Sequence, residues 1–119
     1  MHHCPSCDGA LEVAQLNCQA CGVTYEGRFN QPRLARLDAP QQALIEQIIL
    51  SAANLKDVAK EQGVSFPTLR KRLDGLITAL QEMRAEDEAR CQALLEEVEA
   101  GSIAPEQAAR LIKELNGGL

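Results

Sequence analysis

Three features are missing from this 119-residue chain, and each absence excludes a class of protein. No uncharged apolar run approaches the ~18 residues that a membrane-spanning helix needs, so we expect no membrane span. The chain does not begin with a basic stretch followed by an apolar one, so nothing resembles a secretory signal, and we expect a reducing, cytoplasmic location. There are no internal repeats and no low-complexity stretches.

Catalytic machinery is also missing. The sequence has no nucleophile beside a base, no phosphate-cradling glycine loop and no convergent histidines. Its acidic pairs lie on the surfaces of predicted helices. We therefore do not expect an enzyme.

An excess of positive charge is missing as well, since the net charge is −5 whereas nucleic-acid binders often have a basic balance. Residues 1–30 carry one cation and three anions, residues 31–83 carry seven and six, and residues 84–119 carry four and eight. Only the middle segment is slightly basic. A single copy should therefore bind DNA weakly and with strong salt dependence, so two copies would be needed.

Four of the five cysteines form two matched pairs near the start of the chain, with two residues inside each pair. They are Cys4, Cys7, Cys18 and Cys21. This spacing lets both sulfurs of a pair reach one ion at about 2.3 Å, and tetrahedral zinc is the usual occupant of four-thiolate sites. Gly9 and Gly22 follow the pairs, where we expect the chain to turn with positive φ. The pattern predicts one structural zinc ion in a closed site.

Other interpretations of these residues stay open. Ordinary thiols or two disulfides are alternatives, although disulfides fit badly with a reducing location. His2 and His3 could compete as ligands, but beside four thiolates we expect them to be solvated. Iron could replace zinc, yet nothing indicates redox chemistry. The fifth cysteine, Cys91, is expected to pack as a small apolar residue.

Residues 1–30 are too few to fold on an apolar core alone, so the metal is expected to stabilise them. Short stretches with alternating apolar positions, at residues 10–16 and 23–26, are candidate strands. Cysteine pairs flanked by short strands predict a zinc ribbon.

Residues 27–33 show no clear period and are interpreted as the start of a linker. We place the linker between domains at residues 31–37. Phe29 or Leu34 is expected to pack on a neighbouring domain.

Helix-start signals recur in residues 38–83. Asp38 is a good N-cap for a helix that extends to about residue 53. Asn54 can cap a second, shorter helix, and Ser65 can cap a third. A short helix, a glycine-containing turn and a helix opened by serine are the parts of a helix-turn-helix, whose second helix can enter the DNA major groove.

The outward face of the third helix carries cations, and we expect the recognition helix at about residues 66–79. Arg70 and Lys71 could donate to base edges or phosphates, while Phe66 or Thr68 could meet thymine methyl groups. The remaining cations of the motif are better placed for phosphates. The alternative is a merely solvated basic turn. The candidate DNA-contacting residues are Lys56, Phe66, Pro67, Thr68, Arg70, Lys71 and Arg72.

Residues 84–119 predict a helical hairpin. Gly101 ends the first helix and Pro105 starts the second. The charged stretch at residues 84–90 leaves the continuity of the first helix open. Two narrow apolar stripes cannot bury enough surface alone, so we expect docking on a second copy or on the rest of the protein. The first stripe comprises Leu76, Leu80, Met83, Asp87, Cys91, Leu94 and Val98.

Two segments resemble known motifs. Residues 53–73 closely resemble the helix-turn-helix of the Fis-type and sigma-region-four-like regulators. Residues 94–111 resemble short helical hairpins at the ends of several bacterial proteins, some linked to envelope-stress responses, although Ala104 stands where that pattern has a capping serine or threonine. The first resemblance places Ala59, Val64, Leu69 and Leu73 in the core.

Taken end to end, the chain resembles a bacterial family catalogued as domain of unknown function 2089. The resemblance implies a mainly α chain with a small N-terminal β zinc ribbon, a helix-turn-helix core and a C-terminal helical hairpin. We expect a zinc-containing transcriptional regulator that binds double-stranded DNA as a homodimer or higher oligomer. The alternative is a protein adaptor whose ribbon and helix-turn-helix surface bind RNA polymerase, a sigma factor or another regulator.

Overall fold

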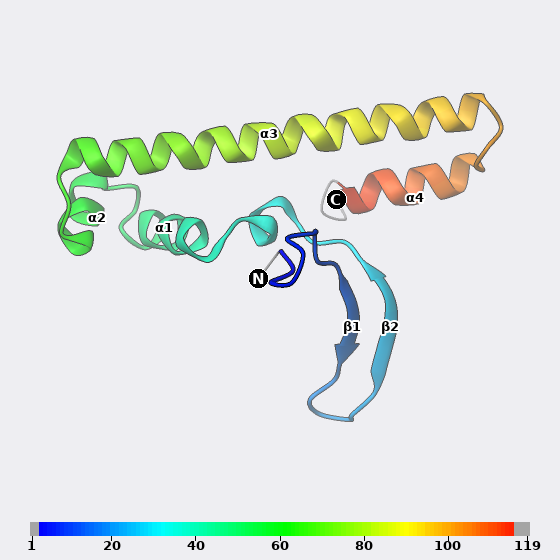
Figure 1. Ribbon diagram of the computed structural model, residues 1–119, viewed down its shortest axis with the longest axis horizontal. Coiled ribbons are helices and arrows are strands. Elements are labelled where there is room, and N and C mark those ends of the chain that lie inside the picture. Colours follow the sequence, from blue (N-terminus) through cyan, green and yellow to red (C-terminus); the bar gives the residue numbers. More distant parts are fainter. Residues whose placement is uncertain (1–2, 116–119) are drawn as a thin grey trace.

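One long helix runs the length of the protein, and the other helices lie on one side of it (Figure 1). The computed structural model describes residues 3–115. The fold class predicted from the sequence, a mainly helical chain with a small N-terminal sheet, is confirmed. No helix among the described residues is both long and apolar enough to cross a membrane. The elements are β1 (Val13–Asn17), β2 (Thr24–Phe29), the 3-10 helix η1 (Arg33–Arg36), α1 (Ala39–Leu50), α2 (Leu55–Gln62), α3 (Phe66–Glu99) and α4 (Pro105–Leu115).

Side-chain caps close the three helix starts that the sequence predicted. Asp38 accepts from the backbone N–H of Gln41 at 2.9 Å, and the Gln41 side chain accepts from the N–H of Asp38 at 3.1 Å. This is a complete capping box, which satisfies two backbone donors at once. Asn54 caps α2 and Ser65 caps α3, each by accepting from the N–H three residues on.

α1 is shorter than predicted. It ends at Leu50 rather than near residue 53, because Ala52 and Ala53 adopt left-handed φ values of 54° and 65°. Their N–H groups donate to carbonyls in the last turn of α1. Helices usually end this way at glycine, because a left-handed backbone costs alanine about 1 kcal/mol or more. Two alanines therefore gave no sequence signal for the end of the helix.

α3 is a single helix of 34 residues, so the helix continues through the charged stretch at residues 84–90. At 1.5 Å per residue it is about 50 Å long. Neither proline nor glycine occurs between Gly75 and Gly101, so nothing in the chain interrupts it. Every residue of the predicted apolar stripe is buried or half-buried, as expected. The domain boundary placed between residues 83 and 84 falls inside this helix.

The apolar core lies where α1, α2 and the first half of α3 meet. Val64 and Leu73 pack against it, half-buried, as the resemblance to known regulators implied. Leu37 is fully buried although it lies in the stretch assigned to a linker, and no prediction placed it in the core. The buried members are Leu37, Leu44, Val58, Ala59, Leu69 and Leu76.

η1 orders the segment between the sheet and α1. Gln42 donates its side-chain amide to the carbonyls of Leu34, Ala35 and Leu37 at 3.3, 3.2 and 3.0 Å. A helix of four residues satisfies few of its own carbonyls, since here only the one of Leu34 also accepts from a backbone N–H, that of Leu37 at 3.4 Å, and the glutamine supplies the other hydrogen bonds. Of the two residues expected to pack on a neighbouring domain, Phe29 is half-buried and Leu34 is 53% exposed.

β1 and β2 form an antiparallel hairpin with a shift in register. Three pairs follow one register, and then Val13 faces Phe29, so that β2 carries one extra residue. This bulge interrupts the alternation of side chains, which explains why residues 27–33 showed no clear period. The expectation that the strand ends at residue 26 was therefore wrong. No residue from 3 to 30 is fully buried, so this part of the chain has no apolar core of its own.

A buried charge ties η1 to the middle of α3. Asp87 is 5% exposed, and its Oδ2 accepts from Arg33 Nε at 2.8 Å and from Arg36 Nη2 at 2.6 Å. Two cations around one carboxylate offset the free-energy cost of removing it from water. The sequence had placed Asp87 in the inward stripe of α3 but gave it no partner.

Arg33→Ala combined with Arg36→Ala should lower the free energy of unfolding by about 3 kcal/mol, because the carboxylate of Asp87 stays buried without a cation. Adding Asp87→Leu should recover most of this loss, since leucine continues the apolar stripe. Urea unfolding of the full chain, followed by circular dichroism, measures both effects. Arg84→Ala with Arg90→Ala removes two exposed arginines of α3 and should cost less than about 1 kcal/mol. No recovery with Asp87→Leu would show that the charge is not the cause.

Candidate metal site and nucleic-acid interface

Both cysteine pairs lie in tight turns held by backbone hydrogen bonds. In the first turn, the N–H of Asp8 donates to the carbonyl of Cys4, and the N–H of Cys4 donates to the carbonyl of Gly9, each at 2.8 Å. In the second turn, the N–H of Gly22 donates to the carbonyl of Cys18 at 2.9 Å. The two turns therefore repeat one local structure.

The two glycines act differently from one another. Gly22 has the predicted positive φ, at 75°, but in the first turn the positive φ of 59° belongs to Asp8 rather than to Gly9. The prediction that Gly9 has a positive φ was therefore wrong, and glycine is favoured there for another reason. A Cβ at Gly9 would lie 3.3 Å from Sγ of Cys7, so the absence of a side chain there leaves space for the sulfur.

The donor atoms in each turn fit half of a four-thiolate zinc site. The sulfurs within each pair lie 3.5–3.7 Å apart, and a tetrahedral ion with bonds of about 2.3 Å needs them about 3.8 Å apart. Hydrogen bonds from the backbone of Ser6 and then of Cys7 lower the pKa of Cys4. Those from the backbone of Cys21 and then of Ala20 lower the pKa of Cys18. A lower thiol pKa favours the thiolate, which is the form that binds metal.

The structure does not bring the two pairs together. The first lies in the turn that precedes β1, and the second lies in the loop at the opposite end of β1, between the strands of the hairpin (Figure 1). Within residues 3–115, no group of three or more His, Cys, Asp or Glu side chains could hold a metal ion. Binding of one ion by all four thiolates therefore requires the first turn to fold back against the hairpin.

The remaining candidates for metal binding take other positions. Nδ1 of His3 lies 3.2 Å from the carbonyl oxygen of Asp8, so this ring contacts the backbone of the first turn. His2 lies outside the described residues. Cys91 is half-buried on the inward stripe of α3, far along the chain from both pairs.

The predicted DNA-contacting residues lie on the first turn of α2 and the first two turns of α3, and all seven side chains are exposed. Leu69 and Leu73 face the core between them, so the cations of this segment point outward. Oγ1 of Thr68 lies 2.9 Å from Oγ of Ser65, within the cap of α3. We refer to residues 66–72 as the basic segment.

The arginines of the basic segment differ in their bonding. Nε of Arg70 lies 3.3 Å from Oδ1 of Asp74 in an exposed pair, which holds the guanidinium only weakly. Arg72 donates to Oε1 of Gln62 at 2.8 Å, and Gln62 donates to Oε1 of Gln47 at 2.6 Å. This relay joins α3, α2 and α1, so Arg72 also fixes the orientation of the basic segment. Sequence reasoning missed both glutamines, because neutral amides leave no charge pattern.

The exposed acids of the hairpin lie on the second half of α3 and on α4, away from the basic segment. Glu86, the nearest acid of the hairpin, lies about 20 Å along the helix from Arg72. This separation exceeds twice the Debye length of about 8 Å at physiological salt, so the hairpin repels a duplex at the basic segment only weakly. The acids of the hairpin that are exposed are Glu86, Glu88, Glu96, Glu97, Glu99, Glu106 and Glu114.

An N-terminal hairpin with two cysteine pairs, joined to a helix-turn-helix, places this chain in the class of zinc-ribbon, helix-turn-helix proteins. Zinc binding and nucleic-acid binding are the properties that this class indicates. Two family models match the chain: the DUF2089 zinc ribbon at residues 4–35, and the domain of unknown function (DUF2089)-HTH at residues 37–82. The chain therefore belongs to the DUF2089 family. Comparison with curated proteins and with solved structures gave no significant match.

The purified chain should contain one zinc ion per polypeptide. Cys4→Ser and Cys18→Ser should each abolish zinc retention, since each removes a ligand from a different pair, whereas Cys91→Ser should keep the ion. Elemental analysis of the metal and titration of the released thiols measure these outcomes. Chelation should unfold residues 1–30 while most of the helical circular dichroism remains, because only the ribbon depends on metal. Two ions per chain would argue against a shared site.

Proposed function

We propose that this protein is a bacterial, cytoplasmic transcriptional regulator that binds double-stranded DNA as a homodimer, and that it is not an enzyme. In this proposal one zinc ion, held by Cys4, Cys7, Cys18 and Cys21, folds residues 1–30. Residues 38–83 bind DNA, with the start of α3, about residues 66–79, in the major groove. Residues 84–119 hold two copies together.

The observation that carries the proposal is the outward display of the basic segment on a helix whose other side packs against the core through Leu69, Leu73 and Leu76. Lys71 donates to base edges or phosphates, as does Arg70 once it leaves its weak exposed pair with Asp74, and Lys56 on α2 contacts a phosphate. Phe66 and Thr68 meet thymine methyl groups. Arg72 already donates a hydrogen bond to Gln62. It therefore attracts the phosphates through its charge rather than through a new hydrogen bond.

Dimer formation follows from the small number of cations. One copy makes few phosphate contacts, so its affinity at physiological salt is low, and a second copy doubles the number. The hairpin of α3 and α4 offers a surface for this purpose. Leu95 is 48% exposed and lines an apolar groove with Val98 and Ile112, and among the described apolar residues of the hairpin only Leu94 and Ala108 are fully buried.

Arg70→Ala combined with Lys71→Ala should weaken binding to mixed-sequence duplex DNA at low salt. It should also reduce the slope of log K against log salt by about 4, because each of the two copies loses two phosphate contacts. Fluorescence anisotropy with a labelled duplex at several salt concentrations measures both quantities. Arg84→Ala with Arg90→Ala makes the same change in net charge on the same helix and should leave the slope unchanged. Wild-type protein that shows no salt-sensitive binding would rule out the DNA-binding proposal.

Leu95→Glu should convert the dimer into a monomer, because the carboxylate would be buried between two hairpins. Ile77→Glu, at a position of α3 that is 39% exposed, serves as the matched control and should remain a dimer. Light scattering after size-exclusion chromatography gives the mass of each variant. A dimer that persists with Leu95→Glu would place the interface elsewhere.

A protein adaptor is the second candidate, with RNA polymerase, a sigma factor or another regulator as its partner. The acidic balance of the chain favours this function, as does the apolar exposure of α1, where Ile49 and Leu50 are 72% and 79% exposed. In this version a protein occupies the helix-turn-helix surface. The anisotropy experiment separates the two functions, since an adaptor needs no salt-sensitive affinity for DNA.

A further inference from the structure

α1 carries apolar residues on its outer side as well as on its inner side. Leu44 and Ile48 pack into the core, whereas Ile49 and Leu50 are 72% and 79% exposed, more than any other large apolar side chain in residues 3–115. Two adjacent large aliphatic side chains left in water form an apolar patch, which burial against a partner would stabilise. The outer side of α1 is therefore suited to contact with another molecule.

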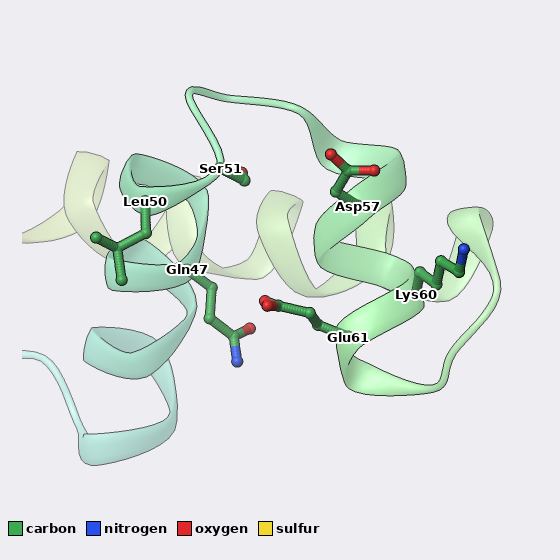
Figure 2. Close-up of a pocket in the computed structure, with 6 residues that line it drawn as sticks. All are labelled: Gln47, Leu50, Ser51, Asp57, Lys60 and Glu61. Atoms are coloured by element: carbon green, nitrogen blue, oxygen red, sulfur yellow. The ribbon is translucent and has the colours of Figure 1, made fainter.

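A hollow of about 550 Å³ adjoins Leu50, between the end of α1 and α2 (Figure 2). Ile49 precedes Leu50 on the outer side of α1, and we call the hollow together with this exposed pair the α1–α2 face. In Figure 2, Gln47 and Glu61 point toward each other across the hollow, whereas Lys60 points away from α1. The hollow is lined by Gln47, Leu50, Ser51, Asp57, Lys60 and Glu61.

Negative charge predominates around the α1–α2 face. Asp57 and Glu61 are exposed on α2, and Glu46 lies on the outer side of α1, one turn before the exposed pair. The single cation at the hollow, Lys60, points away from α1. The side-chain oxygen of Gln47 already accepts a hydrogen bond from Gln62, whereas the carboxylates of Asp57 and Glu61 form no ion pair with any described residue.

This charge decides between the candidate occupants. The phosphates of DNA would meet carboxylates here, and a second copy in two-fold contact would bring the same acids against each other. An apolar segment flanked by lysine or arginine instead complements both the aliphatic pair and the acids. A helix is the form in which a single segment presents apolar side chains to such a groove.

We propose that the α1–α2 face is a docking site for an amphipathic helix of a different protein, apolar on one side and flanked by lysine or arginine. The apolar side of that helix covers Ile49 and Leu50, and its cations pair with Asp57 and Glu61. The basic segment takes no part in this contact. Docking therefore goes beyond the proposed DNA binding and does not depend on it.

The test uses the full, zinc-loaded chain and two synthetic helical peptides of equal length. Both peptides have leucines on one side, and they carry either lysines or glutamates on the flanks. Methyl-resolved NMR titration should show shifts at Ile49 and Leu50 with the lysine peptide, and affinity for the glutamate peptide should be at least about tenfold weaker. Asp57→Lys with Glu61→Lys should reverse that preference. Ile49→Gln with Leu50→Gln should abolish binding of both peptides.

Leu34→Gln with Ile77→Gln provides a matched control, because both residues are exposed aliphatic side chains outside the face. This variant should bind the lysine peptide like the wild type, and circular dichroism confirms that each variant folds. Equal affinity for the two peptides, or peptide-induced shifts confined to the α3–α4 hairpin, would overturn the proposal. So would shifts at Ile49 and Leu50 on addition of duplex DNA, or self-association that Ile49→Gln with Leu50→Gln removes.

Discussion

The ion pairs of Asp87 with Arg33 and Arg36 determine how the parts of this protein are arranged. A carboxylate buried in the apolar stripe of α3 is tolerated only when cations stay beside it, and both cations come from η1. η1 is therefore held against the middle of α3. Because the sheet precedes η1 and α1 follows it, this contact anchors the segment that joins the ribbon to the helix-turn-helix, while the apolar core holds α1 and α2 against α3.

An uninterrupted α3 then keeps the basic segment apart from the acidic hairpin. The basic segment lies at the start of α3, the exposed acids of the hairpin lie on its second half and on α4, and the α1–α2 face lies on the helices packed beside its first half. Opposite charges on one flexible chain would pair with each other and mask the basic segment. A rigid helix prevents this, because it holds Arg72 about 20 Å from Glu86, the nearest acid of the hairpin, and electrostatic attraction at physiological salt is largely screened over that distance. The relay from Arg72 through Gln62 to Gln47 is the polar connection between the basic segment and the α1–α2 face.

Structural features that depend on only a few neighbouring residues could be predicted from the sequence. The caps at Asp38, Asn54 and Ser65 formed as predicted, and so did the tight turn of each cysteine pair, because each depends on neighbouring side chains and backbone. Features that depend on contacts between distant residues could not be predicted. The end of α1 at two left-handed alanines, the bulge in β2 and the burial of Leu37 each depend on packing that no local pattern records.

The candidate sites divide in the same way. The sequence alone identified the candidate residues, namely two cysteine pairs and a run of cations on the exposed side of a helix, because residue type and spacing are local properties. Only the tertiary structure decided that Arg72 is held by an amide, that Asp87 needs two arginines, that Ile49 and Leu50 stay uncovered, and that the two pairs lie at opposite ends of a strand. Burial and distance between remote residues arise from packing of the whole chain, and no segment specifies them by itself.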